Sequence, residues 1–299
     1  MSEGFFSGFI SIIGRPNVGK STLLNQLVGT KVAITSEKSQ TTRNRITGVL
    51  TKDNAQMIFI DTPGIHKPKT KLGEYMVGSA MASTRGVDLI LYIVDASAEV
   101  GPGEYYNLNL LKNIPTKIFL IINKVDLVPK SKIAQLIHLY IEEFDFAEVI
   151  PLSALTGDNI DVLQRLIIDY LPEGPKYYPD DMVTDKPEWF IISEIIREKI
   201  LEATRDEIPH STAVQVETME ERENDLIYIS ATIFVERNSQ KGIIVGKGGR
   251  KLKEIGIRAR NEMEELLGTD IYLDLWVKLK KDWRDRHGIL NQLGYSPKD

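Results

Sequence analysis

The first part of the chain alternates apolar runs with segments of helical length in which apolar and polar residues mix. Leu89–Val94 and Ile118–Ile122 show no polar alternation, as expected of strands buried on both faces of a mostly parallel sheet. Weaker strands are expected at Gly48–Thr51, Met57–Ile60 and Glu148–Ile150. The pattern predicts a layered α/β domain, with helices on both faces of its sheet, over residues 1–171.

A segment without periodicity follows this domain. Leu171–Asp181 is dense in proline and acidic residues, which is typical of an interdomain linker. Its three prolines predict a fairly stiff connector over residues 172–182.

The remaining residues show a different order of patterns. Trp189–Thr204 repeats apolar residues at helical spacing, and strands are expected at Ala213–Glu217 and Leu226–Val235, with a charged turn at Met219–Asp225. From Ile271 to Lys280 apolar and polar residues alternate strictly, as in a strand with one buried face. This order predicts a smaller α+β domain over residues 183–299, with a three-stranded sheet and helices on one face.

Composition supports two domains and narrows their surroundings. A chain of 299 residues is too long for one ordinary core, and its net charge of −5 confines any nucleic-acid site to a local basic patch. The absence of cysteine excludes disulfides and thiolate zinc sites and fits a reducing cytoplasm. We expect a cytoplasmic protein, because no apolar run reaches the length of a membrane-spanning helix and the first residues lack the features of a secretory signal.

Gly14–Ser21 reads Gly-x-x-x-x-Gly-Lys-Ser and directly follows the apolar run Phe9–Ile13. Helix-forming residues begin at Ser21, so a helix N-terminus and inward-turned backbone N–H groups would face a bound anion. The motif predicts a phosphate-binding loop in which Lys20 bridges the outer phosphates and the Ser21 hydroxyl binds Mg²⁺.

Three further motifs lie where predicted strands end. Asp61-Thr62-Pro63-Gly64 would place a carboxylate near Mg²⁺, and a backbone N–H of Gly64 near a γ-phosphate. The carboxylate of Asp126, in Asn123-Lys124-Val125-Asp126, can accept hydrogen bonds from guanine N1–H and the exocyclic amine, whereas adenine would leave that charge unpaired. Ser153-Ala154-Leu155 offers a backbone N–H to the guanine carbonyl. Together the motifs predict specificity for GTP.

These motifs resemble those of the translation-factor-like GTPases of the TrmE–Era–EngA–Septin type over roughly the first 170 residues. The resemblance implies a first switch at Ser39–Arg43, in which Thr42 rather than Thr41 joins the Mg²⁺ shell, and a second switch from Asp61 to about Gly73. Residues expected to bind GTP are Gly14, Arg15, Pro16, Asn17, Val18, Gly19, Lys20, Ser21, Thr22, Thr42, Asp61, Thr62, Pro63, Gly64, Asn123, Lys124, Asp126, Ser153, Ala154 and Leu155. Ser21, Thr42 and Asp61 are the expected metal site.

Hydrolysis is expected to be slow. Ras-like enzymes have a glutamine that orients the attacking water, whereas this chain has Ile65 at that position, which cannot hydrogen-bond to water. Lys20, Thr42, Gly64 and Asn17 are the expected catalytic residues. Asn17 resembles an asparagine that supports a bound K⁺ in related GTPases, and the alternative is that it only tolerates a turn conformation.

A second candidate binding site lies at the turn Gly246-Lys247-Gly248-Gly249, between two predicted short helices. From Lys241 to Arg260 there are seven basic residues and one acidic residue. A solvent-exposed helix face normally carries both signs of charge, so this excess of positive charge favours a surface that binds the phosphates of a nucleic acid. The turn resembles the GXXG loop of type II KH domains, which clamps about four nucleotides of single-stranded RNA. The expected RNA-binding residues are Lys241, Ile243, Ile244, Gly246, Lys247, Gly248, Gly249, Arg250, Lys251 and Lys253, with the apolar ones also suited to the core.

The whole chain is similar to the Era family of bacterial GTPases. That resemblance implies binding to the 3′ end of 16S ribosomal RNA and action in maturation of the small ribosomal subunit by a monomer, in some cases with peripheral contact with the inner face of the cell membrane. The alternative is a regulatory GTPase whose basic patch binds anionic lipid or an acidic protein.

Overall fold

Two units make up the computed structural model, which describes residues 4–295. The first unit comprises the chain up to Thr35 together with residues 42–68 and 76–185. The second comprises residues 36–41 and 69–75 and the chain from Lys186 onward. Two short segments from the first half of the sequence therefore belong to the second unit.

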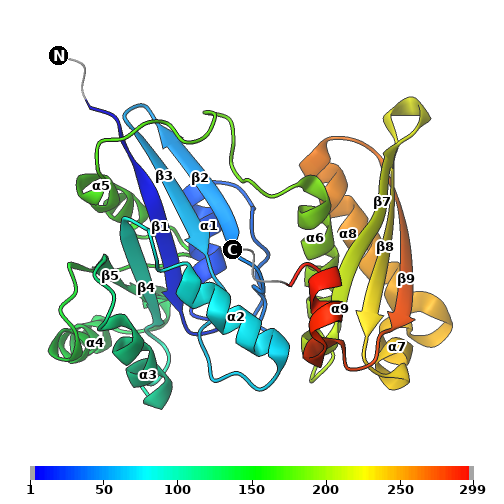
Figure 1. Ribbon diagram of the computed structural model, residues 1–299, viewed down its shortest axis with the longest axis horizontal. Coiled ribbons are helices and arrows are strands. Elements are labelled where there is room, and N and C mark those ends of the chain that lie inside the picture. The colour runs from blue at the N-terminus through cyan, green and yellow to red at the C-terminus, as the bar shows by residue number, and fades with distance from the viewer. Residues whose placement is uncertain (1–3, 296–299) are drawn as a thin grey trace. The chain divides into compact units, whose positions relative to one another are not determined.

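A six-stranded sheet forms the centre of the first unit, in the order β2-β3-β1-β4-β5-β6 (Figure 1). All neighbouring strands are parallel except β2 and β3, which confirms the expected mostly parallel sheet. The strands are β1 (Phe6–Gly14), β2 (Ile46–Lys52), β3 (Ala55–Asp61), β4 (Leu89–Asp95), β5 (Lys117–Asn123) and β6 (Glu148–Pro151).

Helices cover both faces of this sheet (Figure 1). Ala80, Leu108 and Leu136 pack with Tyr92 and Leu120 of the sheet on one face, where α2, α3 and α4 lie. On the other face α1 contacts β2, β3 and α5. The helices are α1 (Lys20–Val28), α2 (Lys71–Ala82), α3 (Pro102–Leu111), the 3₁₀ turn η1 (Val125–Leu127), α4 (Lys130–Glu143) and α5 (Ile160–Tyr170).

The predicted linker is hydrogen-bonded to the first unit. Buried Gln56 accepts hydrogen bonds from the backbone N–H groups of Tyr177 and Tyr178 at 2.8 and 3.0 Å. Further along, Val183 O accepts from the N–H of Val49 at 2.9 Å, and Thr184 donates to Thr47 O at 2.7 Å. These bonds hold the connector against β2 and β3 as far as Thr184.

A three-stranded sheet of order β7-β8-β9 forms the second unit, with β7 and β8 antiparallel and β8 and β9 parallel. One face packs on α6, α7 and α8 through a core that includes Ile196, Ile229, Ile244 and Met263. The elements are α6 (Glu188–Ala203), η2 (Pro209–Ser211), β7 (Ala213–Glu221), η3 (Glu223–Asp225), β8 (Ile227–Val235), α7 (Asn238–Val245), η4 (Lys247–Gly249), α8 (Arg250–Leu267), β9 (Ile271–Leu279), η5 (Trp283–Asp285) and α9 (His287–Gln292).

The structure differs from the sequence-based expectation at three places. β7 extends to Glu221 and so includes part of the predicted turn, because it pairs with β8 as far as Ile227. The second helix after the glycine turn, α8, has 18 residues and is not short. Two elements near the C-terminus, η5 and α9, had no predicted counterpart.

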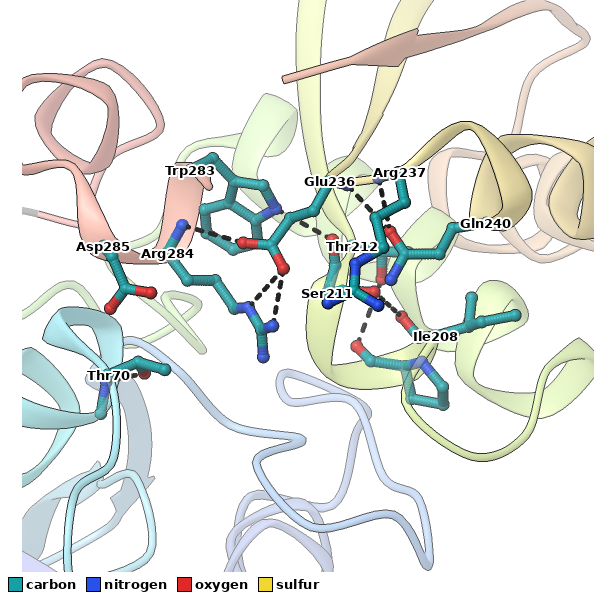
Figure 2. Close-up of polar contacts among 12 residues, drawn as sticks. Thr70, Ile208, Ser211, Thr212, Glu236, Arg237, Gln240, Trp283, Arg284 and Asp285 are labelled. Carbon is teal, nitrogen blue, oxygen red and sulfur yellow. Dashed lines mark hydrogen bonds and ion pairs between the residues drawn. The ribbon is translucent and has the colours of Figure 1, made fainter. Parts of the chain in front are cut away.

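Trp283 of η5 anchors the C-terminal segment that contains η5 and α9 to the rest of the second unit (Figure 2). Its indole is fully buried and donates to Ser211 O at 2.9 Å. The neighbouring Arg284 guanidinium makes two hydrogen bonds to one carboxylate oxygen of Glu236, at 2.6 and 3.1 Å. The buried ring of Trp283 and the charge-assisted pair of Arg284 with Glu236 together attach this segment to the rest of the second unit.

We predict that Trp283→Ala lowers the free energy of unfolding of the second unit by about 3–5 kcal/mol, because it removes a buried ring and leaves Ser211 O without its partner. Trp283→Phe, which keeps most of the volume, should lose less. Denaturant unfolding of the full chain followed by circular dichroism measures both, and equal stability of Trp283→Ala and the natural chain would contradict the anchor.

Candidate functional site

The loop between β1 and α1 lies at the carboxyl edge of the first sheet, where close packing requires glycine at several positions. Gly19 has φ 98°, and a Cβ there would lie 2.2 Å from Asn123 Nδ2. A Cβ on Gly64 would lie 2.5 Å from the backbone N of Pro16. The Asp61–Gly64 turn therefore lies directly against the phosphate-loop motif, as the order of motifs predicted.

Lys20 is buried beneath this loop. Its ammonium donates to Arg15 O at 2.7 Å and to Gly14 O at 3.3 Å. Burial lowers the pKa of Lys20 to about 8, although the negative charges of Asp61 and Glu104 oppose the shift. An anion placed in the loop would favour the charged form further.

Three oxygen-bearing side chains meet at the start of α1. Ser21 Oγ donates to Asp61 Oδ2 at 2.6 Å and lies 2.7 Å from Thr42 Oγ1, which lies 3.3 Å from the same carboxylate oxygen. The hydroxyl of Thr41 instead donates to Lys38 O at 2.6 Å. The structure thus brings Thr42, and not Thr41, to Ser21 and Asp61.

Asp61 itself fits a site for a hard cation. Its side chain is fully buried, and Oδ1 has no hydrogen-bond partner. Burial raises the pKa of Asp61, against the opposing effects of Lys20 and of hydrogen bonds from Ser21 and Thr42. Within residues 4–295, no cluster of three or more histidine or acidic side chains could hold a metal. A cation here would take hydroxyl, carboxylate and ligand oxygens, as Mg²⁺ prefers.

Asn123 connects the loops that the sequence assigned to the phosphates and to the base. Its amide donates to Val18 O at 2.8 Å, and its Oδ1 accepts from the N–H of Ala154 at 2.9 Å. Ser153 and Ala154 are buried, whereas Leu155 is 78% exposed. The carboxylate of Asp126 faces solvent at this edge. The Ala154 N–H therefore supports Asn123 in this structure.

Two acidic residues of this region went unnoticed in the sequence. Asp95 forms a 2.6 Å ion pair with Lys124, which also donates to Asn17 O at 2.8 Å. Burial opposes ionisation of Asp95, but hydrogen bonds from Lys124 and Ser97 outweigh it and lower its pKa. Buried Glu104 accepts from Tyr92 at 2.5 Å and lies 3.4 Å from Arg15. Asp95 ends the buried strand β4, and an acidic residue at a strand end was the feature of the sequence that could have indicated its place at this edge.

The segment after Gly64 turns into the core. Ile65 is buried among residues of α2 and the sheet, and its N–H donates to Gly14 O at 3.1 Å. Thr62 donates to Ile12 O at 2.8 Å. The apolar side chain that replaces the expected glutamine therefore helps to anchor this turn to β1.

The glycine turn of the second unit joins α7 to α8. Gly246, Gly248 and Gly249 all have positive φ, at 71°, 62° and 78°. A groove of about 400 Å³ lies beside the turn, between α8 and β9. It is lined by Gly249, Leu252, Lys253, Gly256, Ile257, Arg260, Ile271, Tyr272, Leu273 and Leu275.

Side chains of the basic segment divide between surface and core. Lys241, Lys247, Arg250 and Lys253 are exposed, as is Ile243. Ile244 is fully buried in the helix–sheet core, which is the packing role that the sequence also allowed for the apolar residues of this segment. Arg258 pairs with Glu202, and Arg260 lies 3.6 Å from Glu264. These pairs lower the net positive charge at the C-terminal end of the basic segment.

Comparisons with known proteins agree with this geometry. Residues 9–124 match the model of the 50S ribosome-binding GTPase family, and residues 207–284 match a KH-domain family. The crystal structure of Era in complex with MgGDPNP and nucleotides 1506–1542 of 16S ribosomal RNA is 42% identical, with TM-score 0.93, over 98% of this chain and 99% of that one. A tyrosine-to-alanine variant of Aquifex aeolicus Era bound to GDP·AlF4⁻ is 41% identical, with the same TM-score, over 98% of this chain and all of that one. Within the described part of this chain, no helix has the length and hydropathy to span a bilayer.

We predict that guanine-nucleotide affinity falls about four-fold between pH 7 and pH 8.5. Lys20 must be charged to hold the phosphates, and with a pKa of about 8 the nucleotide-free protein loses that proton over this interval. Equilibrium binding of a fluorescent GDP across this range measures it. Lys20→Arg, which stays ionised, is the control and should show a flat profile, whereas a flat profile for the natural chain would contradict the assignment.

Proposed function

Because this chain belongs to the Era family of GTPases and hydrolyses GTP, we propose that it is a nucleotide-controlled clamp for the 3′ end of 16S ribosomal RNA in assembly and maturation of the small (30S) subunit. The observation that supports this most is the 42% identity, over nearly all of both chains, to Era bound to a GTP analogue and that RNA. The rival reading, a lipid- or protein-binding patch, is not favoured by this similarity. We further propose a monomer that acts in the cytoplasm.

We assign residues 1–171 to the GTPase domain, 172–182 to the linker and 183–299 to the KH domain. The assignment follows the change in pattern along the sequence and the matched ranges 9–124 and 207–284. The hydrogen bonds of Val183 and Thr184 to β2 attach the start of the last range to the first unit.

Mg²⁺ is the cofactor of this GTPase, as in the MgGDPNP complex of Era. We propose that the hydroxyls of Ser21 and Thr42 and the carboxylate of Asp61 would hold it. The convergence of these oxygens and the unpartnered Oδ1 of Asp61 support the fit. When bound, Mg²⁺ supplies positive charge to the β- and γ-phosphate oxygens.

In hydrolysis, water attacks the γ-phosphorus in line with the leaving oxygen and no covalent intermediate forms. Lys20 neutralises charge that develops on the phosphates, and the backbone N–H of Gly64 binds a γ-phosphate oxygen. The side chain of Ile65 is buried and apolar, so it does not orient the water. We therefore propose a slow intrinsic rate that depends on another group or on a partner.

Asn123, Lys124 and Asp126 form the proposed guanine site together with Ser153, Ala154 and Leu155. The carboxylate of Asp126 selects guanine over adenine by accepting from its N1–H and amine. Asn123 and Lys124 tie this loop to the phosphate loop through Val18 O and Asn17 O. The base and phosphate contacts are thus made by loops that hold one another in place.

In the KH domain, the Gly246–Gly249 turn lets a sugar-phosphate backbone approach closely, and Lys241, Lys247, Arg250, Lys251 and Lys253 neutralise it. Bases would enter the groove between α8 and β9, whose apolar lining includes Leu252, Ile257 and Leu275. Gly256 lies in the wall of this groove opposite Leu275, 3.4 Å from where a Cβ would stand.

Coupling between the two sites has a physical basis within the second unit. Segment 36–41, which directly precedes Thr42, belongs to this unit. So does segment 69–75, which comes after the Asp61–Gly64 turn. Buried Arg197 of α6 donates to Thr41 O, and the N–H of Lys71 donates to Asp285 at 3.1 Å. Nucleotide-dependent ordering of these segments would act on residues of the KH unit directly.

The coupling predicts that the GTP-analogue form binds the RNA at least about five-fold more tightly than the GDP form, since the two nucleotides must favour different arrangements. Fluorescence anisotropy with a short single-stranded RNA from the 3′ end of 16S ribosomal RNA measures both affinities. Replacing Gly248 and Gly249 by Asp should abolish binding in either state, and anionic vesicles serve as the lipid control. Equal affinities of the two forms would refute the coupling, and RNA binding by the double variant would refute the clamp.

The proposed role of Asn17 as a K⁺ support leads to a separate prediction. Replacing K⁺ by Na⁺ at constant ionic strength should lower the rate of hydrolysis about ten-fold or more, because a cation beside the phosphates supplies charge that an arginine finger gives in other GTPases. Asn17→Ala should lower the rate in K⁺ to that in Na⁺. The same rate in both salts would remove the K⁺ site from the mechanism.

A further inference from the structure

A buried acidic side chain in the first turn of α3 contacts the phosphate loop. Glu104 is only 5% exposed, and one oxygen of its carboxylate accepts a hydrogen bond from the hydroxyl of Tyr92 at 2.5 Å. The other carboxylate oxygen lies 3.4 Å from the guanidinium of Arg15, the second residue of the loop. The three side chains therefore connect β4, α3 and the phosphate loop by polar contacts.

Stabilisation of the helix does not by itself account for the burial of Glu104. An acidic residue in the first turn of a helix interacts favourably with the helix dipole, but it can do so while exposed. A buried carboxylate costs free energy unless it is paired and hydrogen-bonded. Burial and the negative charge of Glu104 raise the pKa of Tyr92, so the tyrosine keeps its proton and remains a donor. Tyr92 and Arg15 thus supply the hydrogen bond and the opposite charge that Glu104 requires.

The guanidinium of Arg15 also lies close to the backbone of α3. A Cβ added to Gly103 would lie 3.2 Å from Arg15 Nε and 3.4 Å from Cζ, so a side chain at position 103 would crowd this group. The Arg15 side chain remains 39% exposed. Its position is therefore set by Glu104 and the helix backbone, and not by complete burial.

The backbone of the same arginine contacts the lysine of the loop. Arg15 O accepts a hydrogen bond from the Lys20 ammonium at 2.7 Å, which is shorter than the 3.3 Å bond of Lys20 to Gly14 O. Tyr92 pairs with Ile13 across β4 and β1, directly before the loop begins. A displacement of Arg15 would therefore change the backbone to which Lys20 is bonded.

We propose that Glu104 is a positioning residue of the nucleotide site: through its pair with Arg15 it holds the start of the phosphate loop, and with it Lys20, in the arrangement that binds the phosphates. A loop ordered in advance loses less conformational freedom when the ligand binds. Glu104 acts through Arg15 and Lys20 and is not itself a catalytic residue. The inference rests on the proposed phosphate contacts of Lys20 and adds a residue that lies outside every nucleotide-binding motif.

The test measures the affinity of the full chain and its variants for a fluorescent GDP and a fluorescent GTP analogue in the presence of Mg²⁺. Glu104→Gln keeps an acceptor for Tyr92 but removes the charge that pairs with Arg15. It should weaken binding of both nucleotides about ten-fold, mainly through faster dissociation. Arg15→Met, which keeps an unbranched side chain without the charge, should have a similar effect. The double variant should bind no more weakly than the weaker single variant, because both substitutions remove the same contact.

Glu236→Gln is the matched control. The Glu236 side chain is 10% exposed and pairs with Arg284 at 2.6 Å, so the substitution removes a comparable ion pair from the second unit. It should lower the free energy of unfolding and leave nucleotide affinity unchanged. Phosphorus NMR of bound GDP reports on the loop itself: the β-phosphate resonance should shift in Glu104→Gln and Arg15→Met and keep its position in Glu236→Gln.

Natural affinity of Glu104→Gln or of Arg15→Met would overturn the positioning role, and so would losses that add in the double variant. An equal loss in Glu236→Gln would also overturn it, because reduced stability would then explain the effect. If Glu104→Gln does not fold, Arg15→Met decides the question, since its side chain is partly exposed. Failure of the natural chain to bind GDP would overturn the phosphate site as a whole, whereas natural affinity of the variants would leave that site intact.

Discussion

The burial of two opposite charges, Lys20 and Asp61, at the carboxyl edge of the first sheet is the constraint on which the nucleotide site depends. Neither charge is stable in isolation in a dry environment, so each requires the other and a set of hydrogen-bond partners. The register of β1 with β3 meets this need, since it pairs Asp61 with Ile12 just before the loop that holds Lys20. The site is therefore built into the strand pairing, and the loops complete it.

The same edge also holds the loop proposed for the guanine base at a fixed position relative to the phosphate loop. Asn123 and Lys124 follow β5, yet their side chains bond to the backbone of the phosphate loop after β1. Asp95, at the end of the intervening strand β4, holds Lys124 in this position. Recognition of the base and recognition of the phosphates are thus parts of one hydrogen-bonded framework, which limits the freedom of a bound ligand.

The KH unit solves a different problem, which is to hold a flexible polyanion. It uses three glycines with positive φ where the backbone of the ligand must approach, and exposed basic side chains around them. The groove between α8 and β9 is lined partly by apolar side chains, which we propose to contact bases in a way that the basic residues cannot. Segments 36–41 and 69–75 belong to this unit, so the segments that we propose the nucleotide to order are also part of the unit that carries the glycine turn.

Local signals in the sequence were sufficient for the buried strands, the strict alternation of β9 and both glycine-rich ligand loops, because each depends on short-range patterning. They also predicted that Ser21 and Asp61 lie together, since parallel strands end at the same edge of a sheet, whereas Thr42 was expected only from the family resemblance. Tertiary structure alone decided the ion pair of Asp95 with Lys124 and the anchoring of η5 by Trp283, which join residues with no shared motif. Whether Ile243 or Ile244 faced the core also depended on how α7 met the sheet. Periodicity tells which residues share a face of one element, but the partner of that face is set by the fold as a whole.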